Sequence, residues 1–236
     1  MSPDRKPFRR IGPDGRREAM IDAMLAIIAE EGIAAATTRT VAARAGVTPG
    51  LIRHYFESKD ALLGAAYERH MTELTAATRG TGRGAPGQGE RAPGDARQGG
   101  RAAARLAAFI AAGLRAPVVS AEAVSLWAGF LTHVQRSAAM MDVHARTYAE
   151  FRDHLEGLVA AALAEAGRPA APETLRRHAI ACNAVLDGLW LEGGMLPGAF
   201  APGELASIGL DTIGAMLDLP LTRAAATEDR LEGLET

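Results

Sequence analysis

The sequence is poor in features that secreted, disulfide-bonded and membrane proteins share. It has one cysteine, Cys182, in 236 residues, so it can form neither an intrachain disulfide nor a thiolate-rich metal site. Among its longest apolar runs is 106–114, well short of the roughly 18 to 20 residues that a membrane span needs. The first ten residues carry four basic side chains and no apolar run follows them, which argues against a signal peptide. We therefore expect a cytoplasmic protein.

Patterns typical of enzymes are also missing. No His–Glu pair stands at metal-ligand spacing with a third ligand, and His144 and His154 lie about three helical turns apart. Ser125 and Ser137 lack a nucleophile-elbow context, and the Gly-rich segment 80–100 follows no strand. We predict no catalytic residue, no cofactor and no metal. An enzyme nevertheless stays a competing class.

Charge is unevenly distributed along the chain. Residues 1–59 hold ten basic and seven acidic side chains, whereas the remainder is acidic and brings the formal net charge to -2. A mildly basic head on an acidic body suits a protein that contacts phosphates at one end, although chance asymmetry explains this balance equally well.

Apolar residues recur at spacings of three and four along most of the chain, and no run alternates as a strand does. The sequence therefore predicts an all-α fold of about nine helices. Expected helices cover 14–31, 58–79, 140–166 and 172–193, and the most regular period belongs to a last helix around 205–217. Two short helices are expected between the first two of these, capped by Thr38 and Thr48, with Pro49 at the first position of the second.

The pattern breaks down between residues 80 and 100, which are rich in Gly, Pro, Arg and Gln. We interpret this stretch as a flexible linker, with a segment that touches DNA through its arginines as the alternative. The expected organisation is an N-terminal domain at 1–60, a connecting helix at 61–79, the linker at 80–100, a C-terminal domain at 101–219, and a disordered tail at 220–236.

The strongest motif runs from Thr38 to Lys59 and reads TRTVAARAGVTPGLIRHYFESK. It predicts two short helices joined by a tight turn at Gly46, with Leu51 and Ile52 buried under the second helix. Such a unit can place its second helix in a major groove while the first crosses the DNA backbone. The small residues at the start of that helix allow close approach, and Arg53 can reach a base or a phosphate.

The segment AARAGVTPGLIRHYFESKDALL resembles the DNA-binding domain of the tetracycline-repressor (TetR) family, and the likeness extends over about residues 14–70. The resemblance implies that Phe56 fills the core and that DNA is contacted by Thr38, Arg39, Thr48, Pro49, Gly50, Arg53, His54, Tyr55 and Lys59. Lys59 at the start of a helix adds its charge to the positive helix end and can hold a phosphate. An ordinary core role for Tyr55, and solvated charges at Arg53 and Lys59, are the alternatives.

Two C-terminal segments, LWAGFLTHV and VLDGLWLEGGM, resemble helices of the choline-responsive, BetI-type subgroup of that family. This resemblance implies a small-molecule effector, such as a quaternary ammonium held over aromatic rings. The implied ligand residues are Trp127, Phe130, His133, Met141, Tyr148, Asp187 and Trp190. The alternative for each aromatic residue is simple core packing.

A homodimer is expected, because one helix-turn-helix makes too few base contacts for useful specificity. The last two helices are the expected interface, with Leu186, Leu189, Leu205, Ile208, Gly209, Thr212, Ile213 and Met216. The sequence thus predicts a ligand-responsive repressor of operator DNA, in which the effector shifts the fourth helix. Residues 1–60 are thus expected to form the DNA-binding domain, and residues 101–219 the ligand-binding and dimerisation domain. The alternative is a family member that controls an unrelated gene set, such as efflux or catabolism, and responds to an apolar ligand, and activation in place of repression stays open. An enzyme and a protein-interaction module that has lost DNA binding are the competing classes, and DNA binding that depends on Arg53 would exclude both.

Overall fold

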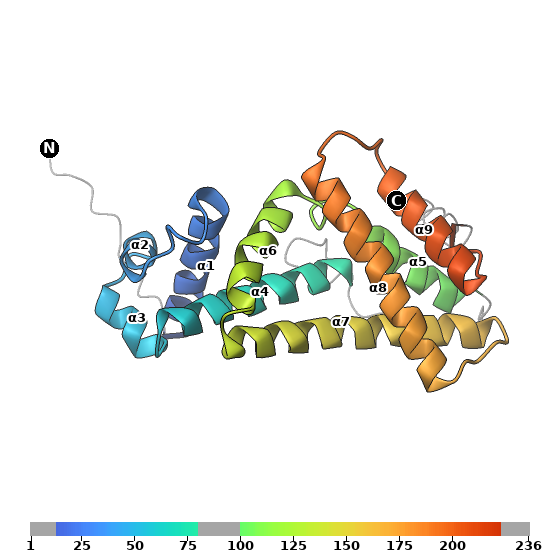
Figure 1. The fold of residues 1–236 in the computed structure, drawn as a ribbon, viewed down its shortest axis with the longest axis horizontal. Helices are drawn as coiled ribbons and strands as arrows, with labels where there is room; N and C mark the ends of the chain where they lie inside the picture. Colours follow the sequence, from blue (N-terminus) through green and yellow to red (C-terminus); the bar gives the residue numbers. More distant parts are fainter. Residues whose placement is uncertain (1–12, 80–99, 223–236) are drawn as a thin grey trace, which may run out of the picture. The chain divides into compact units, whose positions relative to one another are not determined.

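The computed structural model describes residues 13–79 and 100–222, and within these ranges it contains nine helices and no strand, as predicted (Figure 1). The helices are α1 (Pro13–Glu31), α2 (Thr38–Arg44), α3 (Pro49–Tyr55), α4 (Lys59–Thr78), α5 (Arg101–Gly113), α6 (Ala121–Val134), α7 (Ala138–Glu165), α8 (Pro172–Met195) and α9 (Glu204–Leu217). The linker predicted at 80–100 lies, except for Gly100, outside the described residues.

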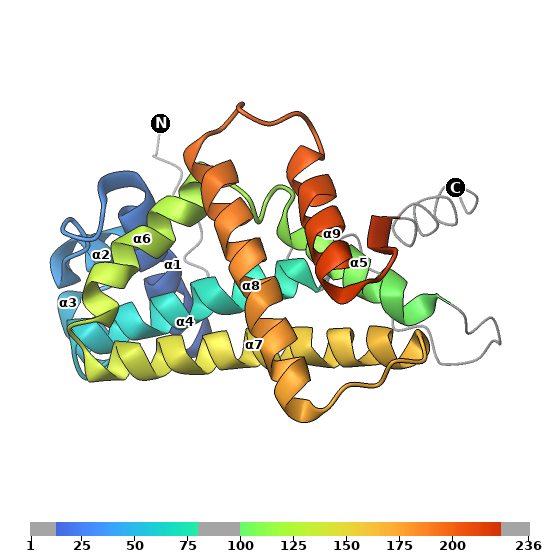
Figure 2. The same cartoon turned by 45° about the vertical axis from the view of Figure 1, so that its right-hand side comes forward.

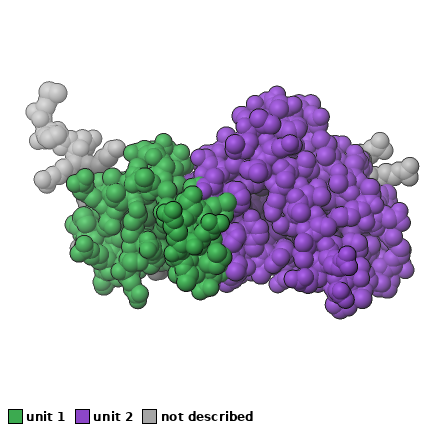
Figure 3. All heavy atoms as spheres, in the orientation of Figure 1, with its two compact units in different colours: residues 1–70, 129–143 green, residues 71–128, 144–236 purple. Residues whose placement is uncertain are grey.

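The chain forms two compact units (Figure 3). The first contains residues 1–70 and 129–143, and the second contains residues 71–128 and 144–236. The boundaries fall inside α4, α6 and α7, so each of these helices contributes residues to both units.

The first unit is built on the apolar face of α1. Met20, Ile21, Met24, Ile27 and Ile28 recur at helical spacing and are all buried. The aromatic ring of Tyr67 packs 4.9 Å, centre to centre, from that of Phe130, and both side chains are fully buried. The unit therefore has its own hydrophobic core, to which Val41 of α2 and Ile52 of α3 also contribute buried side chains.

The second unit has a core formed by α5, α7, α8 and α9. Of these, α5, α8 and α9 lie against one another in Figure 2. Leu106 and Ile110 of α5, Cys182 of α8 and Ile213 of α9 are buried in it. Leu221 is buried in the same core, so the ordered chain continues beyond the expected end of this domain at 219. The remainder of the predicted tail, residues 223–236, lies outside the described residues.

Close packing around α8 depends on a glycine. A Cβ on Gly194 would lie 2.3 Å from Val124 Cγ2 and 3.0 Å from the backbone oxygen of Ser120. We expect Gly194→Ala to lower the free energy of unfolding by about 1–3 kcal/mol, because the backbone contact cannot yield as a flexible side chain would. Gly157→Ala, at an exposed position inside α7, is the matched control. It meets no atom within 4 Å and should be neutral or stabilising by up to about 1 kcal/mol. Urea denaturation of both variants tests this, and equal loss of stability would contradict it.

Candidate DNA-binding surface and effector cavity

Helix α2 begins with a capping box. The Thr37 hydroxyl accepts a hydrogen bond from the Thr40 backbone N–H at 3.1 Å, and the Thr40 hydroxyl accepts one from the Thr37 N–H at 2.9 Å. These bonds satisfy backbone donors that the helix cannot pair internally. The expected cap at Thr38 is therefore wrong by one residue, because Thr38 lies inside the first turn.

Helix α3 has the caps that the sequence predicts. The Thr48 side chain accepts a hydrogen bond from the Leu51 N–H at 3.3 Å, and Pro49 occupies the first helical position. The turn before it includes Gly46 at φ +66°, a backbone conformation that favours glycine. The sequence thus builds a tight turn and a short, well-started second helix.

Helix α3 presents the predicted groove-facing residues to solvent. Thr48, Pro49, Gly50, Arg53 and His54 are exposed, whereas Ile52 on the opposite side is buried. Arg39 is exposed and Thr38, Tyr55 and Lys59 are half-buried. Phe56 is buried, in agreement with its predicted core role. All nine predicted DNA-binding residues therefore retain accessible surface, and their contacts with DNA stay a prediction.

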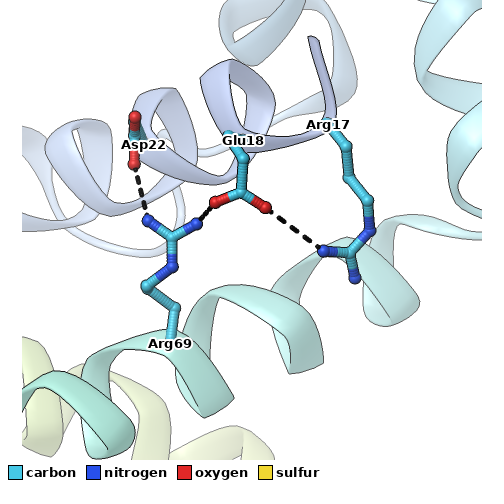
Figure 4. Close-up of polar contacts among 4 residues, drawn as sticks. All are labelled: Arg17, Glu18, Asp22 and Arg69. Carbon is cyan, nitrogen blue, oxygen red and sulfur yellow. Dashed lines mark hydrogen bonds and ion pairs between the residues drawn. The ribbon is translucent and has the colours of Figure 1, made fainter. Parts of the chain in front are cut away.

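An ion-pair network joins α1 to α4 in the first unit and consists of Arg17, Glu18, Asp22 and Arg69 (Figure 4). Arg69 pairs with Glu18 and, at 3.2 Å, with Asp22. Glu18 also lies 3.6 Å from Arg17, whose guanidinium stands 5.3 Å from the centre of the Phe56 ring. The network thus leads from α4 to the residue that ends α3.

The second unit contains a cavity of about 90 Å³. Helices α4 to α8 and the loop after α5 supply its walls. The lining residues are Met71, Leu74, Thr75, Thr78, Gly113, Val118, Trp127, Tyr148, Phe151, Asn183, Leu186, Asp187 and Trp190. Four of them are aromatic and one is a carboxylate, so the cavity combines π-faces with a single acidic group.

The two tryptophans of the chain meet in this cavity. The rings of Trp127 and Trp190 lie edge to face, with 5.7 Å between their centres. The Trp190 indole N–H donates a 2.8 Å hydrogen bond to the Val118 carbonyl, which fixes the orientation of that ring. Burial, followed by the charge of Asp187, raises the pKa of Tyr148 to about 12. Tyr148 therefore stays neutral and offers an uncharged aromatic face at physiological pH.

Asp187 supplies the acidic group of the cavity. Asn183, one helical turn earlier on α8, donates a 2.8 Å hydrogen bond from its amide to Asp187 Oδ2. Desolvation raises the pKa of Asp187 to about 6, whereas the hydrogen bond from Asn183 lowers this pKa. Part of the side chain still faces solvent. Above pH 6 the cavity wall thus carries an ionised carboxylate that is still open to solvent on one side.

Four of the seven predicted ligand residues line the cavity: Trp127, Tyr148, Asp187 and Trp190. Phe130, His133 and Met141 do not, because all three belong to the first unit. Phe130 stacks there with His70, 6.3 Å between ring centres, and Met141 is exposed. The sequence interpretation missed the α4 wall, whose threonines look like surface residues. It also missed Asn183, which the four-residue spacing to Asp187 would have revealed.

The predicted dimerisation residues divide between core and surface. Leu186, Leu205, Gly209 and Ile213 are buried in the chain's own core, and Leu189 and Met216 pack against it. Ile208 and Thr212 are exposed. The exposed apolar side chains of α8 form a different stripe, with Ile180, Ala184, Gly188, Leu191 and Met195 at helical spacing. The regular apolar period of α9 therefore serves mainly the core.

None of the described helices is long and apolar enough to cross a membrane. Within residues 13–79 and 100–222 no group of His, Cys, Asp or Glu side chains is placed to hold a metal ion. Burial raises the pKa of the Cys182 thiol to about 12, so this cysteine stays protonated and chemically quiet.

A capped, exposed second helix after a tight turn, together with a separate cavity lined by aromatic residues, defines a helix-turn-helix transcription regulator. Comparison with known families agrees with this class. Residues 20–66 match the family of bacterial regulatory proteins of the tetR type, and residues 102–218 match the C-terminal domain of BetI-type transcriptional repressors. The chain belongs to the TetR family, with a C-terminal domain of the BetI type.

Individual relatives support this assignment. The chain is 31% identical to the regulator BetI of Burkholderia thailandensis and 32% identical to that of Paraburkholderia phymatum, in each case over 75% of this chain and 81% of the relative. A solved transcriptional regulator from Pseudomonas aeruginosa PAO1 is 31% identical, with a TM-score of 0.70 over 91% of this chain and 96% of that one. A regulator from Saccharomonospora viridis, solved with choline, shares the fold at 16% identity and a TM-score of 0.63, over 85% and 96% of the two chains.

Proposed function

We propose that this protein is a repressor that leaves its operator when a small organic cation, of the quaternary ammonium type, enters the cavity of the second unit. The observation that carries the proposal is the pairing of Trp127, Trp190 and Tyr148 with the Asp187 carboxylate around one cavity. Aromatic faces attract a cation through their quadrupole, and the partly desolvated carboxylate neutralises its charge. The same site disfavours an anion, because the aromatic faces and the Asp187 carboxylate both repel negative charge.

Choline is the first candidate effector. A regulator of the same fold binds it in Saccharomonospora viridis, and the C-terminal domain here is of the BetI type. A methylated ammonium has no N–H to donate, so it suits a site that offers π-faces rather than many hydrogen-bond acceptors. The apolar walls at Leu74, Val118 and Phe151 favour an uncharged, apolar effector as the second candidate.

Trp127 and Trp190 make the binding experiment direct, because the chain has no other tryptophan. The purified protein is titrated with choline and with 3,3-dimethyl-1-butanol, its uncharged isostere, while tryptophan emission is recorded. We expect choline to change the emission at concentrations at which the isostere does not. Equal responses would support the apolar effector, and no response to either would remove the choline assignment.

In the proposed complex with operator DNA, α3 lies in the major groove. Its exposed polar residues read base edges, while Thr38, Arg39, Tyr55 and Lys59 hold phosphates. Two copies of the chain would bind successive grooves with their recognition helices about 34–36 Å apart. Entry of the effector would change the position of α4 and thereby that spacing. The protein acts by binding and carries out no reaction, and its place of action is the cytoplasm, where the operator is.

Dimerisation would use the exposed stripe of α8, together with Ile208 and Thr212 of α9. Leu191 is 40% exposed and Met195 is 62% exposed, values that suit an apolar surface covered by a partner. We expect Leu191→Glu to yield a monomer in light scattering and to weaken DNA binding at least about 100-fold, since half of the groove contacts are lost. Ala145→Glu adds the same charge at an exposed site of α7 and should remain dimeric. A dimeric Leu191→Glu protein would contradict this interface.

A further inference from the structure

Arg69 stands next to the point where α4 enters the cavity wall. Its side chain is only 15% exposed and pairs with Glu18 and Asp22, which lie one helical turn apart on α1 (Figure 4). Two residues further along α4, Met71 lines the cavity, and Leu74 follows one turn later. Because α4 is one continuous helix from Lys59 to Thr78, a shift or rotation of its cavity segment can be transmitted to the turn that carries Arg69.

The other end of the same network reaches the recognition helix. Glu18 is shared by Arg69 and Arg17, and the Arg17 guanidinium faces the ring of Phe56. Phe56 is buried, and its backbone N–H donates to the Ile52 carbonyl at 2.8 Å, which closes the last turn of α3. Its chain neighbour is Tyr55, a predicted phosphate contact. A displaced Glu18 therefore changes the support of the helix end that holds the DNA backbone.

We propose that Arg69 is a positioning residue that couples the effector cavity to the recognition helix through Glu18, Arg17 and Phe56. The inference rests on the proposed function, since it specifies how occupancy of the cavity reaches the DNA-binding surface. The network contacts α1, α4 and the end of α3, so a movement of α4 at Arg69 can reach Phe56 through side chains that are already in contact. Arg69 also neutralises two acidic groups that would otherwise repel each other on one face of α1.

Reciprocity provides a test that needs no effector. If cavity occupancy changes DNA affinity, DNA binding must change the affinity of the cavity for the effector by the same factor. A coupling that is carried by the position of α4 also changes the surroundings of the two cavity tryptophans when DNA binds. Trp127 and Trp190 report on the cavity alone. The full-length protein is titrated with labelled DNA from upstream of its own gene, and DNA anisotropy and tryptophan emission, excited beyond the DNA absorption band, are read together.

Wild-type protein should change its emission in step with DNA binding. Arg69→Met should still bind the DNA, within about threefold of wild type, but lose the emission change, because the link is cut while the contact surface is intact. Arg69→Lys keeps the positive charge and should recover part of the change. Should Arg69→Met fail to fold by circular dichroism, Glu18→Gln replaces it, since that change weakens the pairs with both Arg17 and Arg69.

Arg44→Met is the matched control, because Arg44 pairs with Glu30 and so joins α1 to α2 within the same unit without involving α4. It should retain the emission change. Three results would overturn the coupling role: an unchanged response in Arg69→Met, an equal loss in Arg44→Met, or wild-type DNA binding without any emission change. Failure of the wild type to bind any DNA would instead overturn the proposed function, and the coupling with it.

Discussion

Asp187→Asn should reduce the affinity for choline roughly 10- to 100-fold, which corresponds to about 1.4–2.8 kcal/mol. The substitution removes the only carboxylate among the cavity-lining residues but keeps the size of the side chain and an oxygen that can accept the bond from Asn183. Affinity for 3,3-dimethyl-1-butanol should not change. Isothermal titration calorimetry of both ligands with both proteins measures the difference, and equal choline affinity in the two proteins would rule out a charge-reading role for Asp187.

The same carboxylate predicts how binding depends on pH. With a pKa of about 6, Asp187 is ionised at pH 7.5 and mostly protonated at pH 5, so choline affinity should fall roughly tenfold between these values. The raised pKa also means that Asp187 favours the folded, ligand-free protein at low pH, and that this contribution is lost as the pH rises through 6. The Asn variant should therefore melt no lower than wild type at pH 7.5.

One other group near the cavity also titrates in acid. The centre of the His144 ring lies 4.4 Å from that of Tyr148, with the two rings tilted, and burial lowers the pKa of His144. It gains a positive charge at low pH and would repel a cation. Comparing the pH profiles of Asp187→Asn and His144→Gln separates the two effects. The pH dependence of choline affinity should flatten in Asp187→Asn and persist in His144→Gln.

Lys59→Met should weaken DNA binding to all sequences by a similar factor, roughly tenfold per subunit, because its expected partner is a phosphate. The slope of log affinity against log salt should fall by about 2 for a dimer, one per subunit. Arg53→Ala should instead cost about 1–3 kcal/mol per half-site on the operator and much less on unrelated DNA, as expected for a base contact.

Arg176→Met removes an exposed positive charge from α8 in the second unit and serves as the control for both changes. Anisotropy titrations at several salt concentrations on operator and unrelated DNA distinguish the three variants. If Arg176→Met changed the salt slope as much as Lys59→Met, the binding surface would not be the one formed by α2, α3 and the start of α4.

Local signals in the sequence were sufficient for the helix-turn-helix. Thr48, Pro49 and Gly46 define a cap, a first helical position and a turn that need no information from distant residues. The cap of α2 was misplaced by one residue because Thr37 and Thr38 are adjacent and both suitable. The geometry of the capping box, which also needs Thr40, decides between them.

Local signals could not predict where each apolar helix face packs in the tertiary structure. Trp127 and Phe130 lie three residues apart on one apolar face of α6, yet the first lines the cavity and the second packs in the other compact unit. In α9 the strongest apolar period was interpreted as a subunit interface, but most of that stripe packs in the chain's own core and only Ile208 and Thr212 are exposed. The exposed stripe of α8 includes Ala184 and Gly188, which carry too little apolar surface to stand out in a sequence.

Release of DNA by choline tests the central claim most directly. The wild-type protein is bound to a labelled fragment from its own promoter region, and choline or 3,3-dimethyl-1-butanol is added while anisotropy is followed. We predict that choline releases the DNA, that the uncharged isostere does not, and that Asp187→Asn needs roughly 10- to 100-fold more choline for the same release. DNA that stays bound at saturating choline, or that both compounds release equally, would contradict a cation-responsive repressor.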